Sequence, residues 1–237
     1  MDLIVGNWQL TLQRHPLARA ALIQRYDRAA PRWHAMLARL GYLRAYADLF
    51  ERLVAEHRLS AFGSAARILD CGLGTGALSL ALAETVGPRF QLDGVDIASG
   101  MLAEARRHFQ AAGISATLHQ RSIQQLPFAD NTFDAVMCAH VLEHVSDPAT
   151  TLNEFMRVLR PGAPLLLIVT RPGLATARLR INWQATAYAP GVALALLDEA
   201  GFHERQLIPL SRGLPRCWSC AFLSYKPILH ECESTLN

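Results

Sequence analysis

The stretch from Ile68 to Leu78, ILDCGLGTGAL, places glycines at positions 72, 74 and 76 directly after an apolar run. Glycine lets the backbone come close to a ligand, and a glycine-rich turn that opens a helix directs backbone amides at it. Such loops are typical of nucleotide sites. A dinucleotide in this loop would indicate an oxidoreductase, and S-adenosylmethionine (SAM) would indicate a methyltransferase.

Two carboxylates flank the loop. A dinucleotide fingerprint has Gly-x-Gly-x-x-Gly or Ala with an acidic residue about 20 positions further on. Gly72, Gly74 and Ala77 meet that spacing, and Asp96 lies at the required distance, so the loop alone leaves both ligands open. Asp70 favours SAM, because a carboxylate can accept from the ammonium of an amino-acid ligand and would repel a pyrophosphate.

The elements that position these residues alternate from Ala66 onward. Short apolar strands are predicted at 67–71, 90–97, 116–123, 133–140 and 164–170, with helices at 76–86, 99–112 and 147–159. This order predicts a parallel sheet with helices on both faces. After a helix at 191–200, strands at 202–209 and 218–225 are separated by a loop and should pair antiparallel.

Residues 1–60 show no clear strand. Apolar residues recur there at helical spacing from Pro16 to Leu59, which predicts two or three helices. Pro31 fits the first turn of a new helix, and Gly41 suggests a break.

Together the motifs resemble the class I SAM-dependent methyltransferases, most of all their ubiquinone/menaquinone-type small-molecule branch. The resemblance rests on DCGLGTG (70–76), GVDIASGMLAEAR (94–106), LPFADNTFDAV (126–136), HVLEHVSDP (140–148) and EFMRVLRPGAPLLLI (154–168). It implies an α/β, Rossmann-like, doubly wound seven-stranded sheet, mostly parallel, with a C-terminal antiparallel hairpin. Residues 1–60 would form a helical lid, and 61–237 the methyltransferase domain with a substrate-wall insertion at about 171–190.

The resemblance also implies a cofactor site. Asp70 and the glycines would hold SAM, Asp96 would accept from both ribose hydroxyls, and a helix N-cap is its alternative role. At 122 the family often has Asp, and the hydroxyl of Ser accepts more weakly. The cofactor residues predicted in this way are Asp70, Gly72, Gly74, Gly76, Asp96, Ile97, Met101, Ser122, Ile123 and His140, with a plain core role as the alternative for Met101.

His144 and Tyr26 are the candidates near the chemistry. Methyl transfer is an in-line displacement that depends on alignment and desolvation, and histidine suits an acceptor that must lose a proton. The segment from Tyr26 to Trp33 resembles the family's lid. In phosphoethanolamine-type methyltransferases a lid tyrosine and a histidine placed like His144 close over the site, which predicts a Tyr26–His144 contact. The alternatives are histidines that only pack the loop and an aromatic stripe that packs the lid.

The segment 171–190 is predicted to line the substrate side. Its candidates for holding a carboxylate, phosphate or ring, together with the lid tryptophan, are Trp33, Arg178, Arg180, Trp183 and Tyr188. A solvated amphipathic helix is the alternative.

Composition limits the remaining classes. A net charge of +3 without a basic tract argues against nucleic-acid binding, and no apolar run is long enough for stable membrane insertion. With no secretory pattern and five scattered cysteines, we expect a cytoplasmic protein with reduced thiols. The Cys217-x-x-Cys220 pair alone is too weak to indicate a metal, so none is expected.

We therefore expect methyl transfer from SAM, with S-adenosylhomocysteine (SAH) as product, to an O, N or C nucleophile of a small molecule. Three alternatives stay open: a lipid or quinone acceptor at a membrane surface, a nicotinamide-dependent oxidoreductase, and a non-catalytic SAM-binding protein. A monomer and a homodimer are both compatible with the sequence.

Overall fold

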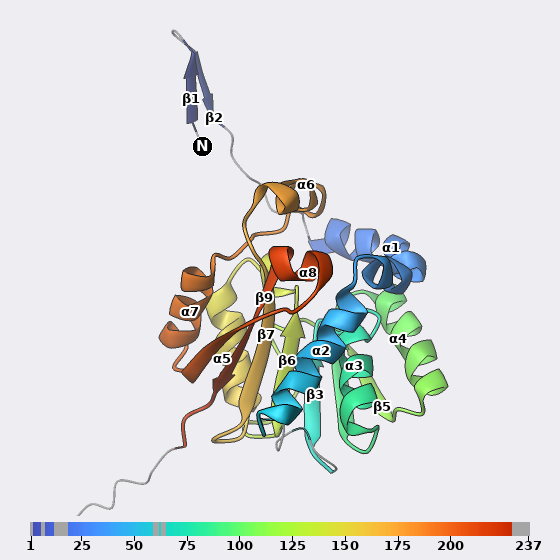
Figure 1. Ribbon diagram of the computed structural model, residues 1–237. Coiled ribbons are helices and arrows are strands. Elements are labelled where there is room, and N and C mark those ends of the chain that lie inside the picture. Colours follow the sequence, from blue (N-terminus) through green and yellow to red (C-terminus); the bar gives the residue numbers. More distant parts are fainter. Residues whose placement is uncertain (1, 6–7, 12–18, 59–61, 63–64, 229–237) are drawn as a thin grey trace, which may run out of the picture.

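A computed structural model describes residues 2–5, 8–11, 19–58, 62 and 65–228 (Figure 1). Its centre is a seven-stranded sheet in the order β5-β4-β3-β6-β7-β9-β8. The neighbours from β5 to β7 are parallel, and β9 is antiparallel to both β7 and β8. The doubly wound, Rossmann-like sheet and its C-terminal hairpin are therefore confirmed. The strands are β3 (Arg67–Cys71), β4 (Gln91–Asp96), β5 (Ala116–Gln120), β6 (Ala135–Ala139), β7 (Pro164–Thr170), β8 (His203–Pro209) and β9 (Ser219–Tyr225).

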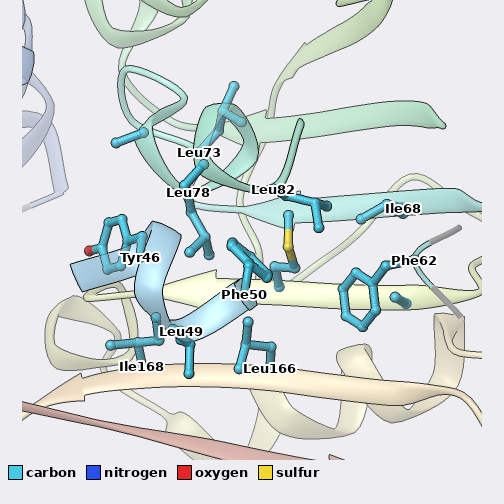
Figure 2. Close-up of a cluster of buried hydrophobic side chains, with 14 of the residues drawn as sticks. Tyr46, Leu49, Phe50, Phe62, Ile68, Leu73, Leu78, Leu82, Leu166 and Ile168 are labelled. Carbon is cyan, nitrogen blue, oxygen red and sulfur yellow. The ribbon is translucent and has the colours of Figure 1, made fainter. Parts of the chain in front are cut away.

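Helices cover both faces of this sheet. They include α3 (Ala77–Val86), α4 (Ser99–Ala112), α5 (Pro148–Val158) and α7 (Pro190–Glu199), all within a few residues of their predicted places. Successive residues of a strand point to opposite faces, so Ile68 belongs to one apolar cluster and Leu69 to the other. Figure 2 shows the first cluster, where Leu49 and Phe50 pack against the sheet at Leu166.

The predicted N-terminal helices are α1 (Arg19–Arg39) and α2 (Tyr42–Ala55). Gly41 separates them with a φ of +85°, a left-handed conformation that glycine adopts without strain. Pro31, however, lies inside α1 and starts no new helix. In Figure 1, α1 lies at the same end of the sheet as α6 (Leu174–Trp183) and α8 (Gly213–Trp218).

Three short elements differ from the predictions. Residues 1–60 do contain strands, because β1 (Asp2–Val5) and β2 (Trp8–Thr11) form an antiparallel hairpin. The helix α8 lies where only a loop was predicted between β8 and β9, and α6 lies in 171–190, where a helix was the alternative to a substrate wall. Four to ten residues hold too few repeats to show a period clearly. Among the described residues, no helix combines the length and the apolar character needed to cross a bilayer.

Candidate cofactor and acceptor site

A cavity of about 330 Å³ lies at the carboxyl ends of β3, β4 and β6, where parallel α/β sheets bind ligands. Its wall is shared by the glycine loop, the turn after β4, the loop after β6 and the helix α1. Twelve predicted site residues line it, which are Tyr26, Trp33, Asp70, Gly72, Gly74, Asp96, Ile97, Met101, Ser122, Ile123, His140 and His144. The structure thus brings these residues, which come from distant segments of the sequence, together around one cavity.

The three loop glycines have different tasks. A Cβ on Gly72 would fall 2.0 Å from a methyl carbon of Val141, so the loop after β6 can pack directly on this backbone. Gly74 lines the cavity with a φ of +54°. Gly76 is not among the lining residues, and a Cβ there would lie 2.6 Å from the ring of Phe109. The structure thus gives Gly76 a role in helix packing.

Asp70 is a buried carboxylate that lines the cavity, with 2% of its surface exposed. Ser79, on α3, donates its hydroxyl hydrogen to Asp70 Oδ2 at 2.6 Å. Burial raises the pKa of Asp70 to about 7, although the Ser79 hydrogen bond opposes the shift. A group poised between its two charge states in this way gains its full charge when a cation binds beside it.

Asp96 organises the neighbouring loops. Its Oδ2 accepts from the backbone NH of Gly74 at 2.8 Å, and its Oδ1 accepts from that of Ala98 at 2.9 Å. Burial raises the pKa of this carboxyl, and the backbone hydrogen bonds oppose the rise. Each carboxylate oxygen has a second lone pair, so both can still accept from a hydroxyl in the cavity.

Four of the predicted cofactor residues, Ile97, Met101, Ser122 and Ile123, line the cavity after β4 and β5. Met101 is buried and packs with Ala30 of α1 and Ala98, so it has a core role as well as a place in the cavity wall. Because β5 ends at Gln120, Ser122 lies in a loop, where its hydroxyl accepts from the NH of Gln124 at 3.3 Å.

The predicted contact between Tyr26 and His144 is present. Tyr26 Oη and His144 Nε2 are hydrogen-bonded at 2.8 Å, and burial raises the pKa of Tyr26 far above its usual range, so the phenol is neutral. The Tyr26 ring stacks on Trp183, with centroids 5.0 Å apart, and meets Trp33 edge-on at 5.4 Å. Aromatic side chains from α1 and α6 therefore gather around the hydrogen bond.

Two further contacts of α1 were not predicted. Asp27 Oδ1 accepts from the backbone NH of Gly100 at 2.7 Å, at the start of α4, and His34 Nδ1 lies 3.4 Å from Thr75 Oγ1 of the glycine loop. One helix thus bonds to three cofactor-side segments. The sequence feature that could have indicated the Asp27 contact is the position of Asp27 directly after Tyr26.

His140 is held by a polar cluster behind the cavity wall. Its φ is +59°, a left-handed conformation that is uncommon for a residue with a side chain. Its Nδ1 lies 3.1 Å from Thr170 Oγ1 and 3.3 Å from Glu143 Oε1. Glu143, which sequence reasoning missed, has a side chain only 1% exposed and accepts from the NH of Thr170 at 2.6 Å. Burial would raise the pKa of Glu143, but His140 and His144 outweigh it and lower that pKa.

The predicted substrate wall is only partly present at the cavity. Trp183 stacks on Tyr26, and Arg25 lies 5.8 Å from the Trp183 ring and donates to the carbonyl of Asn182. Arg178 and Arg180 lie in α6, but their side chains are outside the described part of the chain.

Tyr188 was predicted to face the substrate, but it lies in the core. It is 5% exposed, belongs to a core cluster and donates its hydroxyl to the carbonyl of Leu142, so its polar end is used inside the protein. It is not among the residues that line the cavity.

The Cys-x-x-Cys pair is split between two environments. Cys217 is exposed in α8, and Cys220 is buried in β9. Within the described ranges, no group of three or more His, Cys, Asp or Glu side chains is arranged to hold a metal.

Comparisons with known proteins agree with the resemblance drawn from the motifs. A family described as a methyltransferase domain matches residues 68–162. A ubiquinone/menaquinone biosynthesis C-methyltransferase UbiE of Desulfotalea psychrophila is 39% identical over 108 residues, covering 46% of this chain and 43% of that protein. Its counterpart in Syntrophotalea carbinolica is 39% identical over 143 residues, covering 60% and 58%. This chain spans about half the length of the curated relatives it matches.

The fold has a close counterpart among solved structures. A SAM-dependent methyltransferase of Thermotoga maritima superposes with a TM-score of 0.67 at 17% identity, over 86% of this chain and 99% of that chain. At this identity the likeness shows the Rossmann-like methyltransferase fold and no more.

Proposed function

We propose that this chain, whose residues 68–162 match a methyltransferase-domain family, is a SAM-dependent methyltransferase that transfers a methyl group from SAM to a small acceptor molecule. The observation that carries the proposal is a single cavity that joins the cofactor residues Asp70 and Asp96 to the Tyr26–His144 hydrogen bond. One side of the cavity fits the cofactor, and the lid side fits an acceptor.

The residues present fit SAM. Asp70, buried with a pKa of about 7, offers a carboxylate to the ammonium group. Asp96 offers oxygens to the ribose, and Ile97 and Met101 offer apolar surface to the adenine. When bound, SAM supplies a methyl group made electrophilic by its positively charged sulfur. The protein's residues would bind and orient that group.

Tyr26 and His144 would close the site. Their hydrogen bond joins α1 to the loop after β6, and the tryptophans beside Tyr26 add cover. Closure excludes water and aligns the acceptor, which are the main requirements of a methyl displacement. The intact contact and the paired cofactor carboxylates favour an enzyme over a non-catalytic SAM-binding protein.

The acceptor side of the cavity is mainly apolar and aromatic. It includes Leu22, Leu37 and Tyr46 besides Trp33, and Arg19 is the cation among its lining residues. Such a lining suits an apolar ring, and the relatives named above are C-methyltransferases of ubiquinone/menaquinone biosynthesis. We therefore favour an acceptor that carries an aromatic ring and keep the quinone alternative within the same proposal.

Calorimetry with SAH and, separately, NADH tests the cofactor. We expect micromolar binding of SAH alone, and weaker binding to Asp70→Asn. Binding of NADH alone would overturn the proposal in favour of an oxidoreductase. Absence of binding by either ligand to the folded protein would contradict SAM as well.

Turnover is then measured as methyl transfer from isotopically labelled SAM. The acceptor panel consists of 1,4-dihydroxynaphthalene, catechol and tyramine. We expect methylation of a ring compound. SAH binding without transfer to any of the three would contradict an aromatic acceptor while leaving the cofactor assignment intact.

A further inference from the structure

We propose that the acceptor is an anion, an aromatic ring that carries a carboxylate or a phosphate, and that Arg19 is the residue that selects it. The inference rests on the methyl transfer proposed above and names the charge of its acceptor. It starts from the distribution of charge around the cavity and from one arginine in the cavity wall.

Three helices carry an excess of positive charge. They are α1, α6 and α8, which lie at the same end of the sheet in Figure 1. Of the 23 cationic and 20 acidic side chains in the sequence, these helices hold eight and one, so the remaining residues are acidic on balance. The one acid is Asp27, whose carboxylate accepts from the NH of Gly100. Such a surround attracts anionic small molecules and repels cationic ones.

Arg19 brings one of these charges into the wall of the cavity. The residue lines the cavity and is exposed, and within the described part of the chain it has neither an ion pair nor a hydrogen bond. Other arginines of α1 are engaged, because Arg25 donates to the carbonyl of Asn182 and Arg28 donates to that of Gln24. Arg19 therefore offers a free guanidinium with five N–H donors to a ligand.

The acids of the cavity lie on its cofactor side. Among the described lining residues these acids are Asp70 and Asp96, which the proposed function assigns to the ammonium and the ribose of SAM. The acceptor side is apolar and aromatic, and the sulfur of bound SAM adds a second positive charge to that of Arg19. An anionic acceptor is attracted by both charges, whereas a cationic acceptor is repelled by both.

The spacing along α1 relates Arg19 to the reacting group. Arg19, Leu22 and Tyr26 follow one another at intervals of three and four residues, so they share the face of the helix that lines the cavity. Arg19 precedes Tyr26 by two turns, which is about 10 Å of helix rise. An aromatic ring with its anion toward Arg19 and its reacting group toward the Tyr26–His144 hydrogen bond spans this interval together with the arginine side chain.

The carboxylate of the cofactor is the other anion that Arg19 could bind. It is attached to the same carbon as the ammonium assigned to Asp70, which places it beside the glycine loop. The helix α1 reaches this loop through His34, whose Nδ1 lies 3.4 Å from Thr75 Oγ1. Arg19 precedes His34 by about 22 Å of helix rise. We therefore assign Arg19 to the acceptor.

The first test compares three rings that share the same pair of hydroxyls and differ in charge, which are catechol, 3,4-dihydroxybenzoate and dopamine. In calorimetry on the SAH-loaded protein we expect the acid to bind about 5- to 30-fold more tightly than catechol, and dopamine to bind more weakly than catechol. Equal affinities, or a preference for dopamine, would overturn the proposal. Measured alongside, 3,4-dihydroxyphenylphosphonate shows whether a phosphate-like group or a carboxylate is preferred.

Variants locate the preference in Arg19. In Arg19→Gln the advantage of the acid over catechol should fall below about threefold, whereas Arg19→Lys should keep part of it. Arg28→Gln is the matched control, because it removes the same charge from an exposed position of α1 that does not line the cavity. It should keep the native preference, and an equal loss in both variants would contradict a direct contact.

SAH affinity separates the acceptor from the cofactor as the partner of Arg19. We expect it to change by less than about twofold in Arg19→Gln. A larger loss of SAH affinity would show that Arg19 binds the cofactor carboxylate, which would overturn the assignment.

Two further measurements keep this proposal separate from the proposed function. If the native chain fails to bind SAH, the methyltransferase assignment fails, while titration of the three rings into the free protein still decides whether Arg19 selects an anion. If SAH binds and none of the rings does, the anionic aromatic acceptor is wrong although the cofactor assignment stands. Sedimentation with phosphatidylglycerol vesicles, without a preference among the rings, would assign the charge of the three helices to a membrane surface and overturn the proposal.

Discussion

Asp70 carries the clearest pH dependence at the scale of single residues. Its pKa of about 7 means that part of the free protein holds a neutral carboxyl there, whereas a bound ammonium requires the charged form. Binding below pH 7 must therefore release a proton. We expect SAH affinity to rise about tenfold per pH unit below that value and to level off above it, as measured by calorimetry between about pH 5 and 8.

Two variants test whether Asp70 causes this pH dependence of SAH affinity. Asp70→Asn should bind SAH weakly with little pH dependence over that range. Ser79→Ala should move the transition to higher pH, because the Ser79 hydrogen bond favours the charged carboxylate. An unchanged affinity profile in Asp70→Asn would show that another group controls it.

Tyr26→Phe tests the hydrogen bond to His144 while keeping the ring that stacks on Trp183. A net hydrogen bond contributes about 0.5–1.5 kcal/mol, so we expect kcat to fall by about 2- to 10-fold with little change in SAH affinity. Turnover and calorimetry on the same samples measure both. Tyr225→Phe, at the end of β9, is the matched control, and equal kcat values in the two variants would refute a special role for Tyr26.

At the scale of elements, we expect the hydrogen bond between Asp27 of α1 and Gly100 of α4 to hold α1 in its place. Asp27→Ala removes the carboxylate that accepts from Gly100, a cap-like contact of about 0.5–2 kcal/mol. We expect faster amide hydrogen exchange along Arg19–Arg39 and SAH binding weaker by about 2- to 30-fold. Asp198→Ala, at an exposed surface position, is the control. Unchanged exchange in α1 would mean that aromatic packing alone holds the helix.

The main elements could be predicted because their patterns are long and unbroken. The strand Pro164–Thr170 is apolar up to its last residue, and Pro161-Gly162 marks the end of the helix before it. The strands β1 and β2 and the helix α8 were not predicted, because each repeats its pattern too few times. Gly41 was correctly predicted to break the helix. Pro31 lies inside α1, because the neighbouring Ala30 packs on α4 and this packing favours a continuous helix.

Some residues of the site could also be predicted from the sequence, and others could not. Residues within a contiguous motif, such as Asp70 and Asp96, could be predicted because the motif fixes their place beside the loop. Ser79 and Glu143 could not, since their roles depend on which side chains the folded elements bring within hydrogen-bond distance. Tyr188 misled because an aromatic residue in a substrate-side segment has the same sequence signature whether it faces the cavity or the core.

At the scale of the whole molecule, stability depends on the side of the sheet farthest from the cofactor loops. Phe222 on β9 is fully buried in the second core cluster. We expect Phe222→Ala to lower the free energy of unfolding by about 3–5 kcal/mol, measured by urea denaturation. Val192→Ala on α7, where the valine is 52% exposed, should change it by less than about 0.5 kcal/mol. A loss below about 1 kcal/mol at Phe222 would mean that this cluster collapses to fill the space.

The position of β9 has a consequence for the order in which the protein is made. Of the seven strands of this sheet it is synthesised last, yet it lies between β7 and β8. While the nascent chain is on the ribosome, β8 leaves the tunnel before β9, the strand it pairs with, is available, and β7 has one edge open. The half that contains β3, β4 and β6 is complete much earlier, so the cofactor loops can fold before the rest. Release of residues 219–225 is then the event that joins the last two strands to the sheet and removes an exposed edge prone to aggregation.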